Sequence, residues 1–302
     1  MIYDTIIIGG GPSGLTAAIY LGRYQRKVLL LTGDIGGQTS IAGTLENYPG
    51  ISQINGFELA NNMLNQVKSL ENVEVKVAEP AKNISVSDMV TITTEKGDYE
   101  AKTALIAAGK RHRELGLDNE KSLIGKGVSY CATCDGPFAK GKDVVIIGGG
   151  YAATEAALIL EKLAKSVAIV NIGKQLSGET LTLQKIESNP SIKVINESST
   201  IEITEEQGSV SGIKYKRNDQ EFQIEAKMIF VEIGQIPNSE NFKDTVELNK
   251  ENEIIIDENN QTSTEKIYAA GDITNISAKQ TIVACGEGAK AAIQINKFLE
   301  KN

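Results

Sequence analysis

Two stretches of the chain share one order of apolar and polar positions: an apolar run, a glycine-rich turn, and apolar residues at every third or fourth position. In the first stretch these are residues 3–8, 9–14 and 15–22. Such an apolar run is typical of a strand buried on both faces, and the spacing after the turn predicts a helix. The next apolar run, residues 28–31, completes a predicted β-α-β unit.

The second stretch repeats this order with a strand at residues 144–147, a turn at 148–153, a helix at 154–163 and a strand at 167–170. Two such units in one chain predict an α/β fold with two Rossmann-like, three-layer nucleotide-binding domains. Other patterns predict a helix at 57–70, hairpins at 73–100, a buried strand at 103–109, short strands at 192–224, a buried strand at 228–234, and a closing helix at 281–299.

The glycines of the first turn fit a dinucleotide site. Gly9, Gly11 and Gly14 have the G-x-G-x-x-G spacing, which serves a tight turn, close approach to a pyrophosphate, and helix–strand packing. The phosphates would lie at the helix N-terminus, where free N–H groups favour anions. The strand at 28–31 is followed by Thr32 rather than by an acid, so we expect no carboxylate contact to the ribose. The second turn has the G-x-G-x-x-A form.

Composition narrows the class of protein. The 302 residues suffice for about two domains, and 41% are apolar and 23% charged, as in globular proteins. A formal net charge of −8 disfavours attraction to nucleic acid or anionic membranes, and no apolar run reaches the roughly 18 residues of a membrane span. The N-terminus enters a predicted strand without an export signal, so we expect a cytoplasmic protein.

Cys131 and Cys134 form a Cys-x-x-Cys motif, directly followed by Asp135. In a cytosolic protein with β-α-β patterns, this spacing indicates redox chemistry, and the acid could transfer protons during thiol exchange. Half of a zinc site is the alternative. His112 is the only histidine and Cys285 the only other cysteine, which leaves too few ligands, so we expect no metal.

The string Cys-Ala-Thr-Cys-Asp-Gly just before the second glycine turn, together with residues 9–14 and Gly271-Asp272, resembles the low-molecular-weight thioredoxin reductases, which are flavoprotein disulfide reductases. The resemblance covers essentially the whole chain. It implies FAD as cofactor, thioredoxin as partner and a homodimer. It also implies that the second domain is inserted into the first, with residues 1–113 plus 245–302 binding FAD and residues 114–244 carrying the cysteines.

The resemblance implies site residues. Those that would hold FAD are Gly9, Gly11, Pro12, Ser13, Gly14, Thr32, Gly37, Gln38, Asn47, Gly109, Gly271, Asp272, Lys279, Gln280 and Thr281. Cys134 would receive the electrons of the flavin, and Cys131 would attack the disulfide of thioredoxin. Asp135 would exchange a proton with the departing thiol; the alternative for this residue is an acid that caps a helix or turn.

One part of the family pattern is missing. The NADPH site of the family places a His-Arg-Arg run and a further arginine where this chain has Asn171, Ile172, Gly173 and Ser177, and Lys174 is the only cation there. Arginine binds a 2′-phosphate with a planar fork that lysine does not reproduce. The departure resembles the ferredoxin-dependent branch of the family, so we expect reduced ferredoxin as the electron donor. A basic face that includes residues 110–113, Arg23, Arg26 and Lys27 could attract it, although such charges are also typical of an ordinary solvated surface.

Other functions stay open. The chain could instead be an NADPH- or NADH-dependent thioredoxin reductase, or a flavin redox sensor without sustained turnover. A flavoprotein that reduces peroxiredoxins is less expected, because such proteins usually carry an additional N-terminal disulfide domain.

Overall fold

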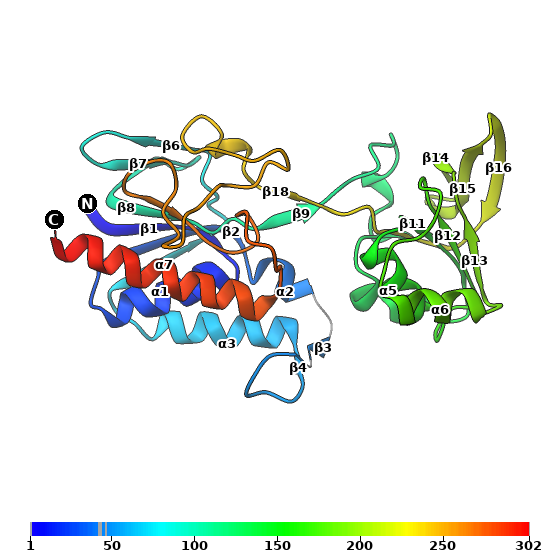
Figure 1. Cartoon of the computed structure of the whole chain (residues 1–302), viewed down its shortest axis with the longest axis horizontal. Helices are drawn as coiled ribbons and strands as arrows, with labels where there is room; N and C mark the ends of the chain where they lie inside the picture. The colour runs from blue at the N-terminus through cyan, green and yellow to red at the C-terminus, as the bar shows by residue number, and fades with distance from the viewer. Residues whose placement is uncertain (1, 42–43, 46, 302) are drawn as a thin grey trace. The chain divides into compact units, whose positions relative to one another are not determined.

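The computed structural model describes residues 2–41, 44–45 and 47–301, without the side chains of Thr44 and Cys134. The chain divides into two compact units (Figure 1). The first unit consists of Met1–Arg111 and Ile236–Asn302, and the second of His112–Gln235. Strands β9 (Lys110–His112) and β18 (Gln235–Pro237) pair with each other where the chain passes between the units.

The first unit is built on a seven-stranded sheet with the order β5-β2-β1-β8-β7-β6, in which β19 also pairs with β8. Strands β1, β2, β5, β8 and β19 are parallel, whereas β6 and β7 add an antiparallel meander. Their bounds are β1 (Ile2–Gly10), β2 (Val28–Ile35), β5 (Val73–Val77), β6 (Asn83–Val86), β7 (Val90–Thr93), β8 (Asp98–Ile106) and β19 (Ile267–Ala269).

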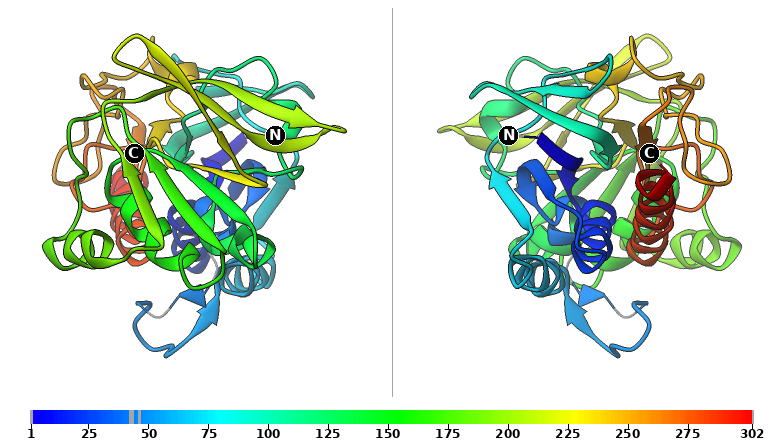
Figure 2. Two further views of the ribbon diagram at one scale, coloured as in Figure 1. Left: turned by 90° about the vertical axis from the view of Figure 1, so that its right-hand side faces the viewer. Right: turned by 90° about the vertical axis from the view of Figure 1, so that its left-hand side faces the viewer.

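Side chains that alternate along β1 serve two cores. Ile7 packs with the apolar faces of three helices, α1 (Pro12–Arg23), α3 (Gly56–Lys68) and α7 (Thr281–Lys301). Ile6 and Ile8 enter a second core with the meander and the segment that follows β18. The right-hand view of Figure 2 looks almost along α1 and α7, which lie side by side. The remaining elements of this unit are α2 (Gly37–Ile41), β3 (Thr44–Leu45), β4 (Ile54–Asn55) and the short helix Glu240–Phe242.

The second unit repeats this arrangement around a parallel sheet of order β10-β17-β11-β12-β13. The strands of this sheet are β10 (Val128–Ser129), β17 (Met228–Val231), β11 (Asp143–Ile147), β12 (Ser166–Val170) and β13 (Ile192–Ile195). Helices α4 (Ala132–Asp135), α5 (Tyr151–Leu160) and α6 (Thr180–Ser188) belong to this unit, as do two short helices, Lys121–Leu123 and Gly136–Ala139. An antiparallel sheet of β14 (Ser199–Glu206), β15 (Ser209–Arg217) and β16 (Gln220–Glu225) forms the third layer. The predicted α/β fold with two Rossmann-like units is confirmed.

Several elements differ from the predictions. Residues 73–77 form a parallel strand beside β2 rather than part of a hairpin, and residues 192–195 likewise belong to the parallel sheet. Helix α5 begins at Tyr151, three residues before the predicted start. Helix α6 was not predicted because only Thr182 and Ile186 are buried in it, which leaves a weak apolar pattern.

The second domain boundary also differs, because the inserted unit ends at Gln235 and not at residue 244. Residues 238–242 belong to the first unit: the Asn238 side chain donates a hydrogen bond to the carbonyl oxygen of Ala108 (2.8 Å). Phe242 is 2% exposed and packs in the same core as Ile6 and Ile254. No composition shift marks this boundary, since the packing that defines it involves residues far apart in the sequence.

We expect Phe242→Ala to destabilise the first unit by about 3–5 kcal/mol, the usual cost of removing a buried phenyl ring. Amide hydrogen exchange in β1 and β8 should then accelerate by about two orders of magnitude or more, while β11 and β17 keep their rates. Phe57→Ala is the matched control, because Phe57 is 63% exposed. Equal exchange rates in the two variants would contradict the assignment of residue 242 to the core of the first unit.

Candidate active site

The first glycine turn connects β1 to α1 with almost no space for side chains. A Cβ atom at Gly9 would lie 2.3 Å from the carbonyl oxygen of Ala107, and one at Gly14 would lie 1.9 Å from the carbonyl oxygen of Gly9. Gly11, in contrast, faces open space. Pro12 occupies the first turn of α1, and no side chain caps this helix. The free backbone N–H groups of this turn can therefore bind an anionic group that approaches Gly11.

Two buried polar atoms beside this turn have no hydrogen-bond partner among the described residues: Ser13 Oγ of α1 and Asp272 Oδ1, which follows β19. Gly271 holds the two segments together, since a Cβ atom there would lie 2.9 Å from the Cβ of Ser13. Burial raises the pKa of Asp272, and Lys279 and Lys110 oppose the shift. Buried polar atoms are normally paired, so both atoms are available to a ligand with phosphate and hydroxyl groups.

Residues of α2, of the loop before β4 and of the start of α7 meet at one place. Asn47 donates a hydrogen bond to Gln280 (3.2 Å), and the hydroxyl groups of Thr39 and Thr281 lie 2.9 Å apart. Gln38 donates to the carbonyl oxygen of Lys110 at 3.3 Å. The structure therefore brings together predicted residues from segments more than 200 positions apart. Thr39 was not predicted, although it stands in the same glycine-rich stretch.

Gly37 and Gly109 also lie at this end of the first sheet. Gly37 has a φ of +49°, and a Cβ atom there would contact the Cα of Gly11 at 3.8 Å. Gly109 follows β8 with a φ of +62°, and its carbonyl oxygen accepts a hydrogen bond from the backbone N–H of Asn238 at 3.0 Å. Both positions therefore have backbone conformations that favour glycine.

Lys279 is held from three sides. Its Nζ donates to the carbonyl oxygens of Asp272 (3.2 Å) and Thr274 and lies 3.1 Å from a carboxylate oxygen of Glu253. Burial lowers the pKa of Lys279, while Glu253 favours the charged form. The lysine thus fixes the turn that carries Asp272.

Thr32, which the resemblance places among the FAD-binding residues, uses its hydroxyl group in two hydrogen bonds within the chain. Its buried hydroxyl accepts a hydrogen bond from the backbone N–H of Gly10 (2.8 Å) and donates one to the carbonyl oxygen of Asp34 (2.6 Å). Strand β2 continues to Ile35, and the exposed Asp34 lies near its end. The sequence-based prediction missed this acid because the apolar run stops at Leu31.

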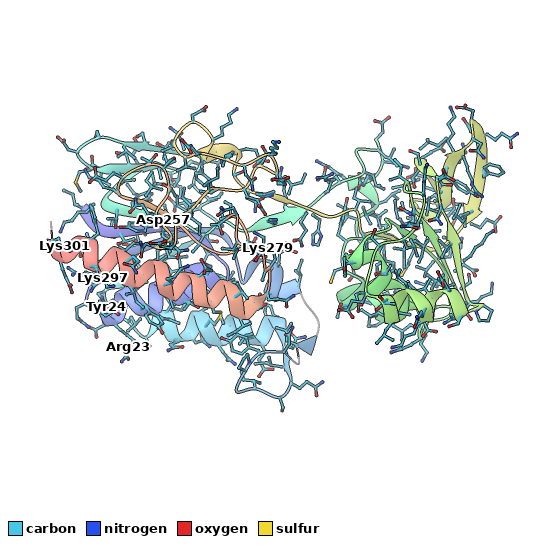
Figure 3. The ribbon with its side chains drawn as sticks, viewed as in Figure 1. Arg23, Tyr24, Asp257, Lys279, Lys297 and Lys301 are labelled. Atoms are coloured by element: carbon cyan, nitrogen blue, oxygen red, sulfur yellow. The ribbon has the colours of Figure 1, made fainter. Side chains whose placement is uncertain are left out.

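Two cations of the basic run at residues 110–113 are paired with carboxylates within the structure. Lys110 pairs with Glu253 (2.9 Å) and Arg111 with Glu240 (2.5 Å), while His112 stacks on Tyr130 and burial lowers the pKa of the imidazole. Arg23 lies at the opposite end of the first unit from Lys279, as Figure 3 shows. The predicted basic docking face beside the flavin loop is therefore not a continuous surface.

In the second unit, Cys131 follows the edge strand β10, and the short helix α4 begins at the next residue. The backbone N–H of Cys131 donates a hydrogen bond to Ser129 Oγ (3.1 Å), and the carbonyl oxygen of Cys131 accepts one from the N–H of Asp135 (3.0 Å). Cys131 is disulfide-bonded; the side chain of Cys134 lies outside the described part of the structure. Asp135 is half-buried, and Phe138, which follows it closely, is 67% exposed. Cys285 is a buried, free thiol.

The second glycine turn differs from the first in what surrounds it. A Cβ atom at Gly149 would lie 2.1 Å from Asn171 Oδ1. The buried Asn171 amide also donates to the carbonyl oxygens of Gly173 (3.1 Å) and Gln175 (3.0 Å). The backbone N–H of Ser177 donates to the carbonyl oxygen of Gly149 at 2.7 Å. The segment after β12 is therefore hydrogen-bonded to the glycine turn.

Within residues 2–41, 44–45 and 47–301, no group of three or more His, Cys, Asp and Glu side chains could hold a metal ion. Over the same part of the chain, no helix is long and apolar enough to span a membrane.

Residues 3–288 match the family model of the pyridine nucleotide-disulphide oxidoreductases, and the chain belongs to that family. The thioredoxin reductase of Lactococcus lactis in its FR conformation is 33% identical, with a TM-score of 0.88 over 99% of this chain and 100% of that one. The chain is thus similar to thioredoxin reductases along its whole length, and its family implies FAD.

Two further relatives are informative. One component of the alkyl hydroperoxide reductase of Pseudomonas aeruginosa is 37% identical over 96% of this chain, which spans 57% of the length of that protein. The ferredoxin-flavin thioredoxin reductase of Clostridium acetobutylicum is 27% identical, with a TM-score of 0.55 over 100% of this chain and 99% of that one.

The internal hydrogen bonds of Asn171 generate a prediction about nucleotide specificity. We expect Asn171→Asp to lower the melting temperature without improving NADH affinity, because the new carboxylate would face the carbonyl oxygens of Gly173 and Gln175. Gln175→Glu, the same change of charge at an exposed neighbouring position, is the control. Thermal unfolding and NADH titration measure the two effects. Tighter NADH binding at an unchanged melting temperature would refute this interpretation of Asn171.

Proposed function

We propose that the protein is an FAD-dependent thioredoxin reductase in which electrons leave the flavin through Cys131 and Cys134 and reduce the disulfide of thioredoxin. The observation that carries the proposal is the Cys-x-x-Cys motif at the end of β10, in a chain that also contains an open glycine turn with unpaired polar atoms. The similarity to thioredoxin reductases along the whole chain supports the same function.

The first unit fits FAD in its chemistry. The N-terminal turn of α1 and Ser13 would bind the pyrophosphate, and Asp272 would accept hydrogen bonds from hydroxyl groups. Asp34 would contact the adenosine ribose, since it is an exposed carboxylate close to the glycine turn. Gln280 and Thr281 would lie near the ring system. When bound, FAD supplies a carrier that takes up electrons singly or in pairs and releases a pair.

The residues of the second unit then have distinct roles. Cys131, as the thiolate, attacks one sulfur of the thioredoxin disulfide and forms a mixed disulfide, while the other sulfur leaves as a thiolate. Cys134 attacks the sulfur of Cys131 in that mixed disulfide and releases reduced thioredoxin. Asp135 exchanges the protons of these steps. The exposed Phe138 offers an apolar contact beside the cysteines for the partner.

We favour reduced ferredoxin as the electron donor. In the first unit, Thr32 packs on the glycine turn, and the exposed Asp34 follows two residues later. In the second unit, Asn171 packs on the glycine turn, and the residue two positions later is Gly173, which has no side chain. Arginine is absent from residues 171–178. Losing several charge-assisted hydrogen bonds of about 1.5–3 kcal/mol each would weaken NADPH binding by orders of magnitude.

NADPH or NADH is the second candidate donor. The second glycine turn keeps the backbone of a dinucleotide site, with a positive φ at Gly148, and the family is named for pyridine nucleotides. The paired charges at Lys110 and Arg111 also remove one argument for an acidic protein partner. A flavin redox sensor without turnover is the third candidate function.

Anaerobic mixing of the oxidised protein with NADPH, NADH or reduced ferredoxin, followed by the flavin absorbance band, tests the donor. We expect ferredoxin alone to bleach the flavin rapidly and thioredoxin to restore the absorbance. Rapid bleaching by micromolar NADPH or NADH would overturn the ferredoxin assignment and leave the cysteine chemistry in place. Bleaching without repeated reduction of thioredoxin would indicate the sensor.

Substitutions of the cysteines test the path of the electrons. We expect Cys131→Ser and Cys134→Ser each to lower thioredoxin reduction at least about 10³-fold, because neither serine can exchange disulfides, while donor-dependent bleaching persists. Cys285→Ser is the control, since this thiol is buried in the first unit. Turnover retained in Cys131→Ser would exclude the proposed role of that residue.

A further inference from the structure

We propose that Glu232 is a redox-linked protonation site of the cysteine pair: it takes up a proton when the pair is reduced and releases it when Cys131 attacks a substrate disulfide. This inference rests on the proposed redox function of Cys131 and Cys134. Glu232 acts as a positioning residue for charge and protons, in addition to the role proposed for Asp135.

The sheet places Glu232 beside Cys131. Strands β10 and β17 are parallel and pair Val128 with Ile229 and Ser129 with Phe230. Continued beyond the strand ends, this register puts Cys131 level with Glu232. The next backbone N–H along the chain, that of Ala132, donates a hydrogen bond to the Glu232 carboxyl group. The carboxyl group is therefore bound to the first residue of α4, directly after Cys131.

The backbone of Glu232 is fixed on its other side. Its N–H donates to the carbonyl oxygen of Ile147 at 2.7 Å. A Cβ atom added to Gly148 would lie 2.2 Å from the carbonyl oxygen of Glu232. These two contacts fix the backbone of Glu232 at the end of β17, next to the glycine turn.

The first unit provides an internal comparison. Gly9 abuts Ala107, the residue that follows β8, just as Gly148 abuts Glu232, the residue that follows β17. At the position equivalent to Glu232, the first unit thus has a buried alanine. A small apolar side chain satisfies the packing at this point of the fold, so packing alone does not require the carboxyl group of the second unit.

The electrostatic setting suits a proton that moves near neutral pH. Burial raises the pKa of Glu232 to about 7, and the hydrogen bond from Ala132 opposes the shift; no cation or second carboxylate perturbs it among the described residues. The titratable residues of the neighbouring segments are Cys131, Tyr130 and, on α4, Cys134 and Asp135. The Tyr130 hydroxyl is engaged with Glu120 at 2.5 Å. On the side of the glycine turn, the next titratable group is Tyr151.

The proposed steps balance. With Glu232 ionised, the disulfide takes up two electrons from the reduced flavin and two protons; the S–S bond breaks to give one thiol and one thiolate, and the carboxylate becomes a carboxylic acid. The thiolate of Cys131 then forms a bond to one substrate sulfur, and the other substrate sulfur leaves as a thiolate. Since the negative charge has left Cys131, Glu232 releases its proton, and Asp135 delivers a proton to the departing thiolate.

The sign of the pH dependence follows from this linkage. In the oxidised protein the pKa of Glu232 is about 7, and an adjacent thiolate raises it, because like charges disfavour ionisation. Between these two pKa values, reduction takes up one additional proton for two electrons. The midpoint potential of the pair should therefore fall more steeply above pH 7 than below, by an additional 30 mV or so per pH unit, which is a tenfold change in the equilibrium constant.

The test is a redox titration of the cysteine pair in the full-length, FAD-loaded protein, equilibrated with dithiothreitol buffers from pH 5.5 to 8.5 and analysed by thiol alkylation. We expect the wild type to show the change of slope near pH 7, Glu232→Gln to lack it, and Glu232→Asp to restore it at a shifted pH. Glu221→Gln, at an exposed position of β16, is the matched control.

A Glu232→Gln profile that superimposes on the wild-type profile would overturn the proposal, and so would a wild type without the change of slope. A residue with only a structural role would alter the melting temperature but not the pH profile, and thermal unfolding of all four proteins separates the two effects. The titration uses dithiothreitol as the reductant and requires neither thioredoxin nor the physiological electron donor. Failure to reduce thioredoxin would therefore overturn the proposed function without changing this result.

Discussion

The close approach of backbone to backbone at the ends of the parallel strands is the constraint on which both units depend. Gly9 lies so close to the carbonyl oxygen of Ala107 that a Cβ atom would not fit between them. Gly148 lies equally close to the carbonyl oxygen of Glu232. Each contact fixes where a strand ends relative to the helix that follows. The polar atoms around each glycine turn are positioned by these two contacts, so the chemistry of each unit begins with them.

The two turns share this backbone and differ in what surrounds them. Around the first, Gly11 faces open space, and buried oxygens of Ser13 and Asp272 lack partners within the described chain. Around the second, the Asn171 amide occupies the space beside Gly149 and uses its hydrogen bonds internally. A buried polar atom without a hydrogen-bond partner destabilises the protein, and a ligand that hydrogen-bonds to it removes this cost. A buried polar atom that is already paired provides no such gain in binding free energy. The first turn is therefore the stronger candidate for a tightly held cofactor.

The sequence predicts this fold well where a feature is local and less well where it depends on distant partners. Apolar runs and glycine spacing identified both β-α-β units, and the Cys-x-x-Cys motif predicts a redox site, at which Cys131 is disulfide-bonded. The segment 73–77 was assigned to a hairpin because its pairing with β2 involves no local turn. Lys110 and Arg111 looked like a free basic surface because Glu253 and Glu240, which pair with them, lie about 130–140 positions away. Glu232 had no sequence pattern of its own, since its proximity to Cys131 follows from the register of β10 and β17.

The position of Glu232 beside Cys131 suggests that Asp135 and Glu232 have different roles in proton transfer. Asp135 lies within α4 and is half-buried, so it has the access to solvent that a proton carrier needs. Glu232 lies at the end of an inner strand, and burial raises its pKa to about 7. The two acids therefore differ in their surroundings, one within a short helix and the other directly after an inner strand. One can then store the proton that accompanies reduction while the other exchanges protons with water and with the leaving thiol.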